Sequence, residues 1–188
     1  MQKICCALGS LAAVAVLMLS AQAADTSVKS GPQVGEEVPG PFHPLNVTGE
    51  DAGEKVCLYC KNGAHPVAMI FARDASEPVT NLIKKIDTAT AQHKSDKMGS
   101  FVVFLSDAED LQGKLKTTAE KQNIKETVLS IDNPAGPKGY NVAKDAEVTV
   151  VLYTNHNVKA NYAFKKGELK ERDIDAIVGD ISKILPKQ

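Results

Sequence analysis

The sequence predicts an α/β fold in which a central mixed β-sheet is flanked by helices and preceded by an N-terminal β-hairpin. Residues 66–72, 101–105 and 148–153 are near-continuous apolar runs, and 127–131 is a weaker one. Runs of this kind are typical of strands buried on both faces. Amphipathic stretches separate the early runs, which predicts parallel strands joined by helices. The last two strands follow one another directly before a final helix, which predicts an antiparallel edge.

The predicted N-terminal hairpin consists of two short strands, 42–47 and 56–60, joined by a turn over 48–55. Asn62-Gly63 is a strong tight-turn signal, so we expect the chain to turn there before the buried strand begins. Residues 158–164 alternate apolar and polar side chains, as in a strand nearer an edge. Asn155-His156-Asn157 is expected to form the hairpin turn that leads into this strand.

Three helices are predicted from apolar residues that recur on one face. The stripes are Val79, Leu82, Ile83 and Ile86, with Ser76 or Asp74 as N-cap; then Leu111, Leu115 and Ala119; and finally Ile174, Ile177, Val178, Ile181, Ile184 and Leu185, before Pro186. These helices fill the gaps between the predicted strands.

The N-terminus predicts export. Residues 1–23 fit a cleavable signal peptide, with Lys3 before an apolar run at 4–19 and a small-x-small cleavage site at Ala21-Gln22-Ala23. Residues 24–41 are expected to form an extended lead-in, and 42–188 the domain. We therefore expect a secreted or periplasmic chain with no membrane segment after cleavage. The net charge of −1 and the absence of Trp or a basic stripe argue against nucleic-acid binding.

Several segments resemble the redoxin branch of the thioredoxin superfamily, which includes peroxiredoxins and exported thioredoxin-like proteins. Residues 34–42 (VGEEVPGPF) resemble the opening of that branch, 66–73 its first buried strand, and 139–142 (GYNV) with 147–152 (EVTVVL) the approach to its late strand. The resemblance covers roughly residues 34–185 and implies a thioredoxin-like three-layer sandwich with thiol–disulfide chemistry.

Two features of the family's active site are absent. The family carries its reactive cysteine where the first buried strand turns into the first helix, but residues 73–78 read Arg-Asp-Ala-Ser-Glu-Pro. Ser76 is interpreted as a helix cap rather than a nucleophile, because no base adjoins it. The family's cis-proline precedes the late strand, and residues 145–149 contain no proline. The family's thiol chemistry is therefore not expected at residues 73–78, where the first buried strand turns into the first helix.

Cys57 and Cys60, a Cys-x-x-Cys pair, are the candidate catalytic residues. They precede the first buried strand, so they would form a relocated site. In an oxidising compartment, a local disulfide that opens and closes is the first hypothesis. Its partners would be protein thiols or disulfides, and no cofactor is needed. The more exposed sulfur should attack, and the usual order in such pairs indicates Cys57. Lys55 and Lys61 would help to lower a thiol pKa.

Two alternatives use the same cysteines. In one, the disulfide is structural and the chain is a catalytically silent thioredoxin-like module for binding other proteins. In the other, the sulfurs bind zinc or copper with imidazole help from His65 or His43. Strictly extended chain would hold Cys57 and Cys60 roughly 10 Å apart, too far for a disulfide, so a disulfide requires a bend at Leu58-Tyr59.

Overall fold

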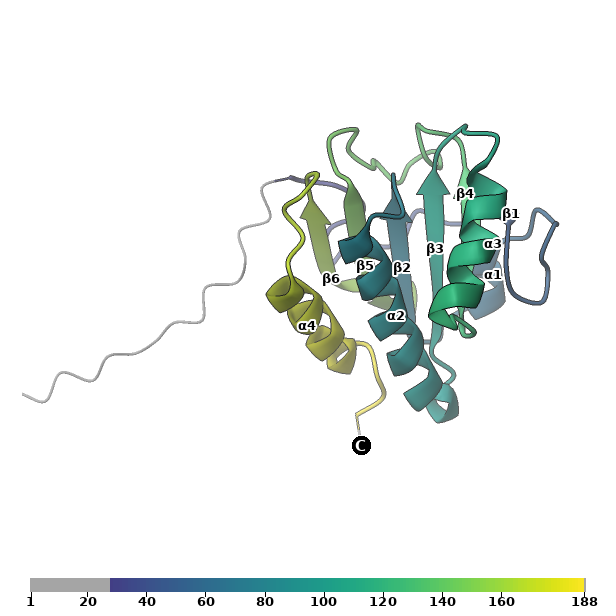
Figure 1. Cartoon of the computed structure of the whole chain (residues 1–188). Coiled ribbons are helices and arrows are strands. Elements are labelled where there is room, and N and C mark those ends of the chain that lie inside the picture. Colours follow the sequence, from purple (N-terminus) through teal and green to yellow (C-terminus); the bar gives the residue numbers. More distant parts are fainter. Residues whose placement is uncertain (1–27, 188) are drawn as a thin grey trace, which may run out of the picture.

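The computed structural model describes residues 28–187 and contains one six-stranded mixed sheet with helices on either side (Figure 1). The predicted signal peptide (1–23) and the first residues of the predicted lead-in lie outside the described residues. The strands are β1 (Leu45–Asn46), β2 (Val67–Ala72), β3 (Gly99–Leu105), β4 (Thr127–Asp132), β5 (Val148–Thr154) and β6 (Asn157–Phe164). The helices are α1 (Leu58–Asn62), α2 (Glu77–Gln92), α3 (Leu111–Gln122) and α4 (Glu171–Gly179), with 3-10 turns η1 (Lys94–Asp96) and η2 (Asp180–Lys183).

The strand order is β1-β4-β3-β2-β5-β6. β2, β3 and β4 are parallel, whereas β5 is antiparallel to β2 and β6 is antiparallel to β5. This arrangement confirms the predicted mixed sheet, including the antiparallel edge. The turn between β5 and β6 is tight, and Asn155 and His156 both adopt left-handed φ angles of 49° and 61°, as a two-residue hairpin turn requires.

The two faces of the sheet are covered differently. Helices α2, α3 and α4 cover one face (Figure 1) and bury a continuous aliphatic core that includes Leu82, Leu115 and Ile177. Among residues 28–187, the other face carries only the one-turn helix α1, together with extended chain and loops. Its core holds more aromatic side chains, among them Phe42 and Tyr140. The predicted three-layer sandwich is confirmed, with the difference that one outer layer is thin.

The predicted second strand of the N-terminal hairpin is wrong. Residues 58–62 form helix α1. Of the expected strand pairing between 42–47 and 56–60, the structure has one isolated bridge nearby, between Leu45 and Lys55. β1 instead pairs with β4, where Leu45 lies opposite Ile131. Gly63 ends α1 with a positive φ of 53°, a conformation that glycine adopts without steric cost. The Asn62-Gly63 signal therefore marks the end of a helix rather than a turn between two strands.

The described part of the lead-in is bound to the sheet. Backbone hydrogen bonds join Gly35 N–H to Val158 C=O (3.0 Å), Val158 N–H to Glu36 C=O (3.0 Å) and Val38 N–H to His156 C=O (2.8 Å). Further along, the hydroxyl of Tyr140 donates to the carbonyl of Gly40 at 2.5 Å. The lead-in therefore follows the start of β6 and then crosses the thinly covered face.

Candidate redox site

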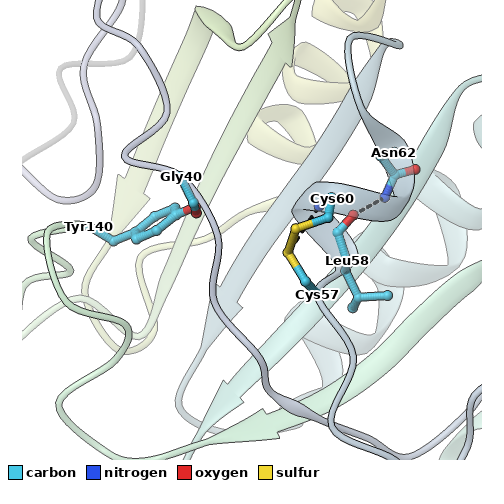
Figure 2. Close-up of a disulfide and its surroundings, with 6 residues drawn as sticks. All are labelled: Gly40, Cys57, Leu58, Cys60, Asn62 and Tyr140. Atoms are coloured by element: carbon cyan, nitrogen blue, oxygen red, sulfur yellow. Dashed lines mark hydrogen bonds between the residues drawn. A yellow bond between two sulfur atoms is a disulfide. The ribbon is translucent and has the colours of Figure 1, made fainter.

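Cys57 and Cys60 are joined by a disulfide at the start of α1 (Figure 2). Cys57 is the N-cap and has extended backbone angles, whereas Cys60 lies inside the helical turn. The turn brings their Cα atoms to 5.2 Å, within the range that a disulfide spans. The bend that a disulfide requires at Leu58-Tyr59 is thus supplied by a helix.

The helical turn is anchored by contacts that do not involve sulfur. Leu58 is buried in the same core cluster as Val67 and Phe71 of β2. The Asn62 side-chain amide donates to the Leu58 carbonyl at 2.8 Å (Figure 2), and Gly63 N–H donates to the Tyr59 carbonyl at 3.1 Å. Non-covalent packing and hydrogen bonds therefore hold the site in place.

A second set of contacts ties α1 to the β5–β6 turn. The Tyr59 ring, between the two cysteines in sequence, has its centroid 4.9 Å from that of His156 and 6.5 Å from that of Tyr153. Asn155 N–H also donates to the Ala64 carbonyl at 2.9 Å. The sequence indicated His156 only as a turn residue, and no local signal pointed to its contact with Tyr59, because the two residues are far apart in sequence.

The two cysteines differ in accessibility. Cys57 is buried, with 6% of its surface exposed, whereas Cys60 is exposed. The sulfur of Cys57 accepts a hydrogen bond from the Cys60 backbone N–H at 3.1 Å. By the criterion that the more exposed sulfur attacks, this geometry favours Cys60 over the Cys57 assignment taken from the usual order.

Lys61 does not offer a free positive charge to the site. Its ammonium group binds the carboxylates of Asp51 (2.5 Å) and Glu50 (3.1 Å), and these hydrogen bonds raise the pKa of Lys61. Its charge is therefore compensated by the loop that precedes α1. Lys55 is exposed and lies at the backbone bridge with Leu45.

Two buried tyrosines lie on the same face as α1. Burial raises the pKa values of Tyr140 and Tyr153 well above the usual value for tyrosine. The Tyr140 hydroxyl has its partner in Gly40, but the Tyr153 hydroxyl and Nδ1 of His156 are buried without a hydrogen-bond partner. The rings of Tyr153 and His156 both neighbour Tyr59, so two unsatisfied polar atoms belong to side chains packed around the α1 turn.

The junction between β2 and α2, where a redoxin carries its cysteine, is occupied by Arg73. Its guanidinium group donates to the carbonyls of Ala146 (3.0 Å), Pro134 (2.9 Å) and Ala143 (3.1 Å). Ser76 is the N-cap of α2, as predicted, but its side chain makes no capping hydrogen bond. Within residues 28–187 there is no cis peptide bond. Arg73 thus fastens the loop before β5 onto the end of β2.

The imidazoles proposed as metal ligands, His65 and His43, are both exposed. In the part of the chain that the structure describes, no three or more His, Cys, Asp or Glu side chains gather as ligands of a metal ion would. None of the helices within residues 28–187 is long and apolar enough to span a bilayer.

No protein-family model matches the sequence, and no curated protein matches it. Solved structures do resemble it. A Chlorobium tepidum protein assigned as the thiol:disulfide interchange protein DsbE is 18% identical, with a TM-score of 0.59 over 85% of this chain and 100% of that one. The chain has a thioredoxin-like fold.

Two further structures support the same fold. The reduced 2-Cys peroxiredoxin of Plasmodium vivax is 22% identical, with a TM-score of 0.60 over 80% of this chain and 81% of that one. A secreted disulfide oxidoreductase of Mycobacterium tuberculosis, homologous to DsbE of E. coli, is 10% identical, with a TM-score of 0.51 over 75% of this chain and 94% of that one. The thioredoxin-like fold confirms the architecture implied by the sequence resemblance.

Proposed function

We propose that this chain is an exported thiol–disulfide exchange protein that works through Cys57 and Cys60, away from the β2–α2 junction. The observation that carries the proposal is the disulfide itself, which joins the N-cap and third residue of a helical turn and leaves one of its cysteines exposed. A partner thiol can reach an exposed disulfide, and exchange proceeds through a mixed disulfide with that partner.

The anchoring of α1 supports reversible chemistry. An exchanger must keep its cysteines in place after the bond opens, and here the packing of Leu58 and the Asn62 hydrogen bond do so without the sulfurs. A four-residue loop also gains little from cross-linking: the loop-entropy relation gives about 2 kcal/mol for a ring this small. The reduced form is therefore expected to remain folded.

The partners we propose are protein thiols or disulfides. Two of the similar structures are described as a thiol:disulfide interchange protein and a disulfide oxidoreductase, and this favours the same class of partner here. Export is proposed from the signal pattern at residues 1–23 and is favoured by the secreted state of the second of these proteins.

The alternative of a catalytically silent module is favoured by one observation, the Arg73 clamp, by which we mean the guanidinium group of Arg73 and the three backbone carbonyls that it binds. A side chain that is committed to three backbone carbonyls gives the usual junction a structural role. In that case the Cys57–Cys60 disulfide would be a static clamp on α1. The two proposals differ in the stability of the bond toward reduction.

The midpoint potential of the Cys57–Cys60 pair tests the proposal. The mature chain is equilibrated in glutathione and dithiothreitol redox buffers, the fraction of free thiol is measured, and metal content is determined on the same sample. We expect a midpoint between about −270 and −120 mV, the range of known exchangers. The double variant Cys57→Ser/Cys60→Ser is the control for catalysed reduction of a protein disulfide. A midpoint below about −300 mV would favour the static clamp, and stoichiometric metal would favour the metal hypothesis.

A further inference from the structure

We infer that the exchange order at this site is inverted: the C-terminal cysteine, Cys60, forms the mixed disulfide with the partner, and the N-terminal cysteine, Cys57, is the leaving and resolving thiolate. This inference rests on the proposed function and names the partner-facing sulfur of the same site. It is carried by the difference in burial between the two cysteines and by the hydrogen bond on one sulfur.

Accessibility decides which sulfur a partner can attack. Thiol–disulfide exchange requires the incoming sulfur to approach along the S–S axis from behind the attacked atom. Cys60 is an exposed residue, whereas Cys57 has 6% of its surface exposed. Leu58, directly after Cys57, enters the core. A partner thiolate can therefore approach Cys60 more easily than Cys57.

The hydrogen bond favours the same order. Cys57 Sγ accepts the backbone N–H of Cys60 at 3.1 Å (Figure 2). A thiolate accepts such a bond more strongly than a disulfide sulfur, because a hydrogen bond to an ionised acceptor is about twice as strong as a neutral one. When the S–S bond breaks, negative charge that develops on Cys57 meets a donor already in place. A lower pKa of the departing thiol speeds its departure.

A partner thiolate attacks Cys60 Sγ, a new S–S bond forms to the partner, and the bonding pair of the Cys57–Cys60 bond leaves on Cys57 Sγ as a thiolate. A second thiolate of the partner then attacks the partner's own sulfur in the mixed disulfide. The partner is released with its disulfide formed, Cys60 leaves as a thiolate, and two electrons have passed to this chain. In the opposite direction, the Cys60 thiolate attacks a partner disulfide and the Cys57 thiolate resolves the mixed disulfide.

The single-cysteine variants Cys57→Ser and Cys60→Ser test the order. Each is treated with glutathione disulfide across pH 6 to 10, and formation of the mixed disulfide is followed by mass. Comparing the plateau rates at high pH, where both thiols are ionised, removes the difference in thiolate fraction, and the pH at which each rate levels off gives each thiol pKa, from which the remaining difference in nucleophilicity is corrected. We expect the thiol of Cys60, in the Cys57→Ser variant, to react about tenfold faster or more than that of Cys57, as accessibility governs the rate. In denaturant the two rates should converge.

A second measurement avoids the variants. Reduced wild-type protein is labelled with less than one equivalent of iodoacetamide, quenched and digested with trypsin. Cleavage after Lys55 and Lys61 releases both cysteines in one peptide, residues 56–61, whose fragment ions locate the label. Label mainly on Cys60 supports the inference. Equal rates, or faster reaction at Cys57, would overturn it while leaving the exchange function intact, whereas an unreducible disulfide would overturn the function whichever cysteine reacts faster.

Discussion

The β2–α2 junction and the α1 turn differ in the kind of side chain that each carries. In the fold this chain shares with redoxins, the junction is the place for a reactive thiol, yet here it holds a guanidinium group bound to three carbonyls. The α1 turn lies ahead of β2 and carries both sulfurs. The same scaffold thus holds a polar cluster around Arg73 at one end and a disulfide on the thinly covered face.

The largest expected effect comes from removing the clamp. Arg73→Ala strips the donor from three carbonyls, and we expect the free energy of unfolding of the oxidised protein to fall by about 2–4 kcal/mol, as measured by urea denaturation. Arg73→Lys is the matched variant and should recover part of this loss, since an ammonium group cannot bridge three carbonyls as a guanidinium does. The reduction rate of the disulfide should stay within about twofold, because α1 is anchored elsewhere. A large change in that rate would contradict the view that the α1 turn is held independently of the β2–α2 junction.

The anchoring of α1 itself should show the next largest effect. Leu58→Ala removes a side chain that is 3% exposed, and a loss of about 2–3 kcal/mol is expected from the cavity and lost burial. Leu58→Met conserves volume and should cost less than about 1.5 kcal/mol. Thermal unfolding of oxidised and reduced protein measures both variants. If Leu58→Ala cost less than about 0.5 kcal/mol, the turn would depend on the disulfide rather than on its packing.

Tyr140 and Tyr153, the two buried tyrosines on the sheet face that carries α1, should respond in opposite directions to loss of the hydroxyl. Tyr140→Phe removes the hydrogen bond to Gly40 and should lower stability by about 1 kcal/mol. Tyr153→Phe removes a buried hydroxyl that has no partner and should raise stability by about 1 kcal/mol. Denaturant unfolding of the two variants side by side gives the comparison. The same sign for both would contradict the assignment of the two hydroxyls.

Alkaline pH should weaken the fold. Burial raises the pKa of Tyr140 and of Tyr153, and burial with a hydrogen bond to Asp180 raises that of Tyr162. Each folded-state pKa lies above the unfolded value of about 10, so the stability they contribute is complete below about pH 10 and is lost as the pH rises above it. Melting temperatures from pH 8 to 11, with phenolate absorbance at 295 nm, measure this. Tyrosines that all ionise near pH 10 without unfolding would contradict it.

The smallest effect is expected at Ser76. Its side chain makes no capping hydrogen bond, so Ser76→Ala should change stability by less than about 0.5 kcal/mol. The midpoint potential of the Cys57–Cys60 pair should not move. Any large loss of exchange activity in this variant would show that the β2–α2 junction takes part in the chemistry after all.

The sequence predicts the sheet well because the apolar side chains of each central strand form a recognisable run in the sequence. The apolar runs at 66–72, 101–105 and 148–153 are long and continuous, and each became a strand at nearly those bounds. Residues 56–60 are short and equally compatible with a strand. In the structure the helical turn of α1 begins here, and Leu58 belongs to the same buried cluster as aromatic side chains from distant segments, among them Phe101 and Tyr140.

The candidate site was only partly visible in the sequence for the same reason. The Cys-x-x-Cys spacing identifies the pair, but the burial of Cys57 and the exposure of Cys60 follow from tertiary packing. The Arg73 clamp is formed with the backbone carbonyls of residues 134, 143 and 146. Every residue has a backbone carbonyl, so the sequence does not indicate which ones accept these hydrogen bonds. Contacts between distant segments therefore set the details of the site.

The lead-in along β6 has a consequence for the solubility of the protein. A strand at the open side of a sheet presents unpaired N–H and C=O groups that can recruit another chain and begin aggregation. Gly35, Glu36 and Val38 occupy the backbone groups of Val158 and His156 at the start of β6, and Asn161 in mid-strand binds the carbonyls of Ser30 and Pro32. We expect proteolysis within residues 30–38 to expose the backbone groups at the start of β6, to which another chain can then pair.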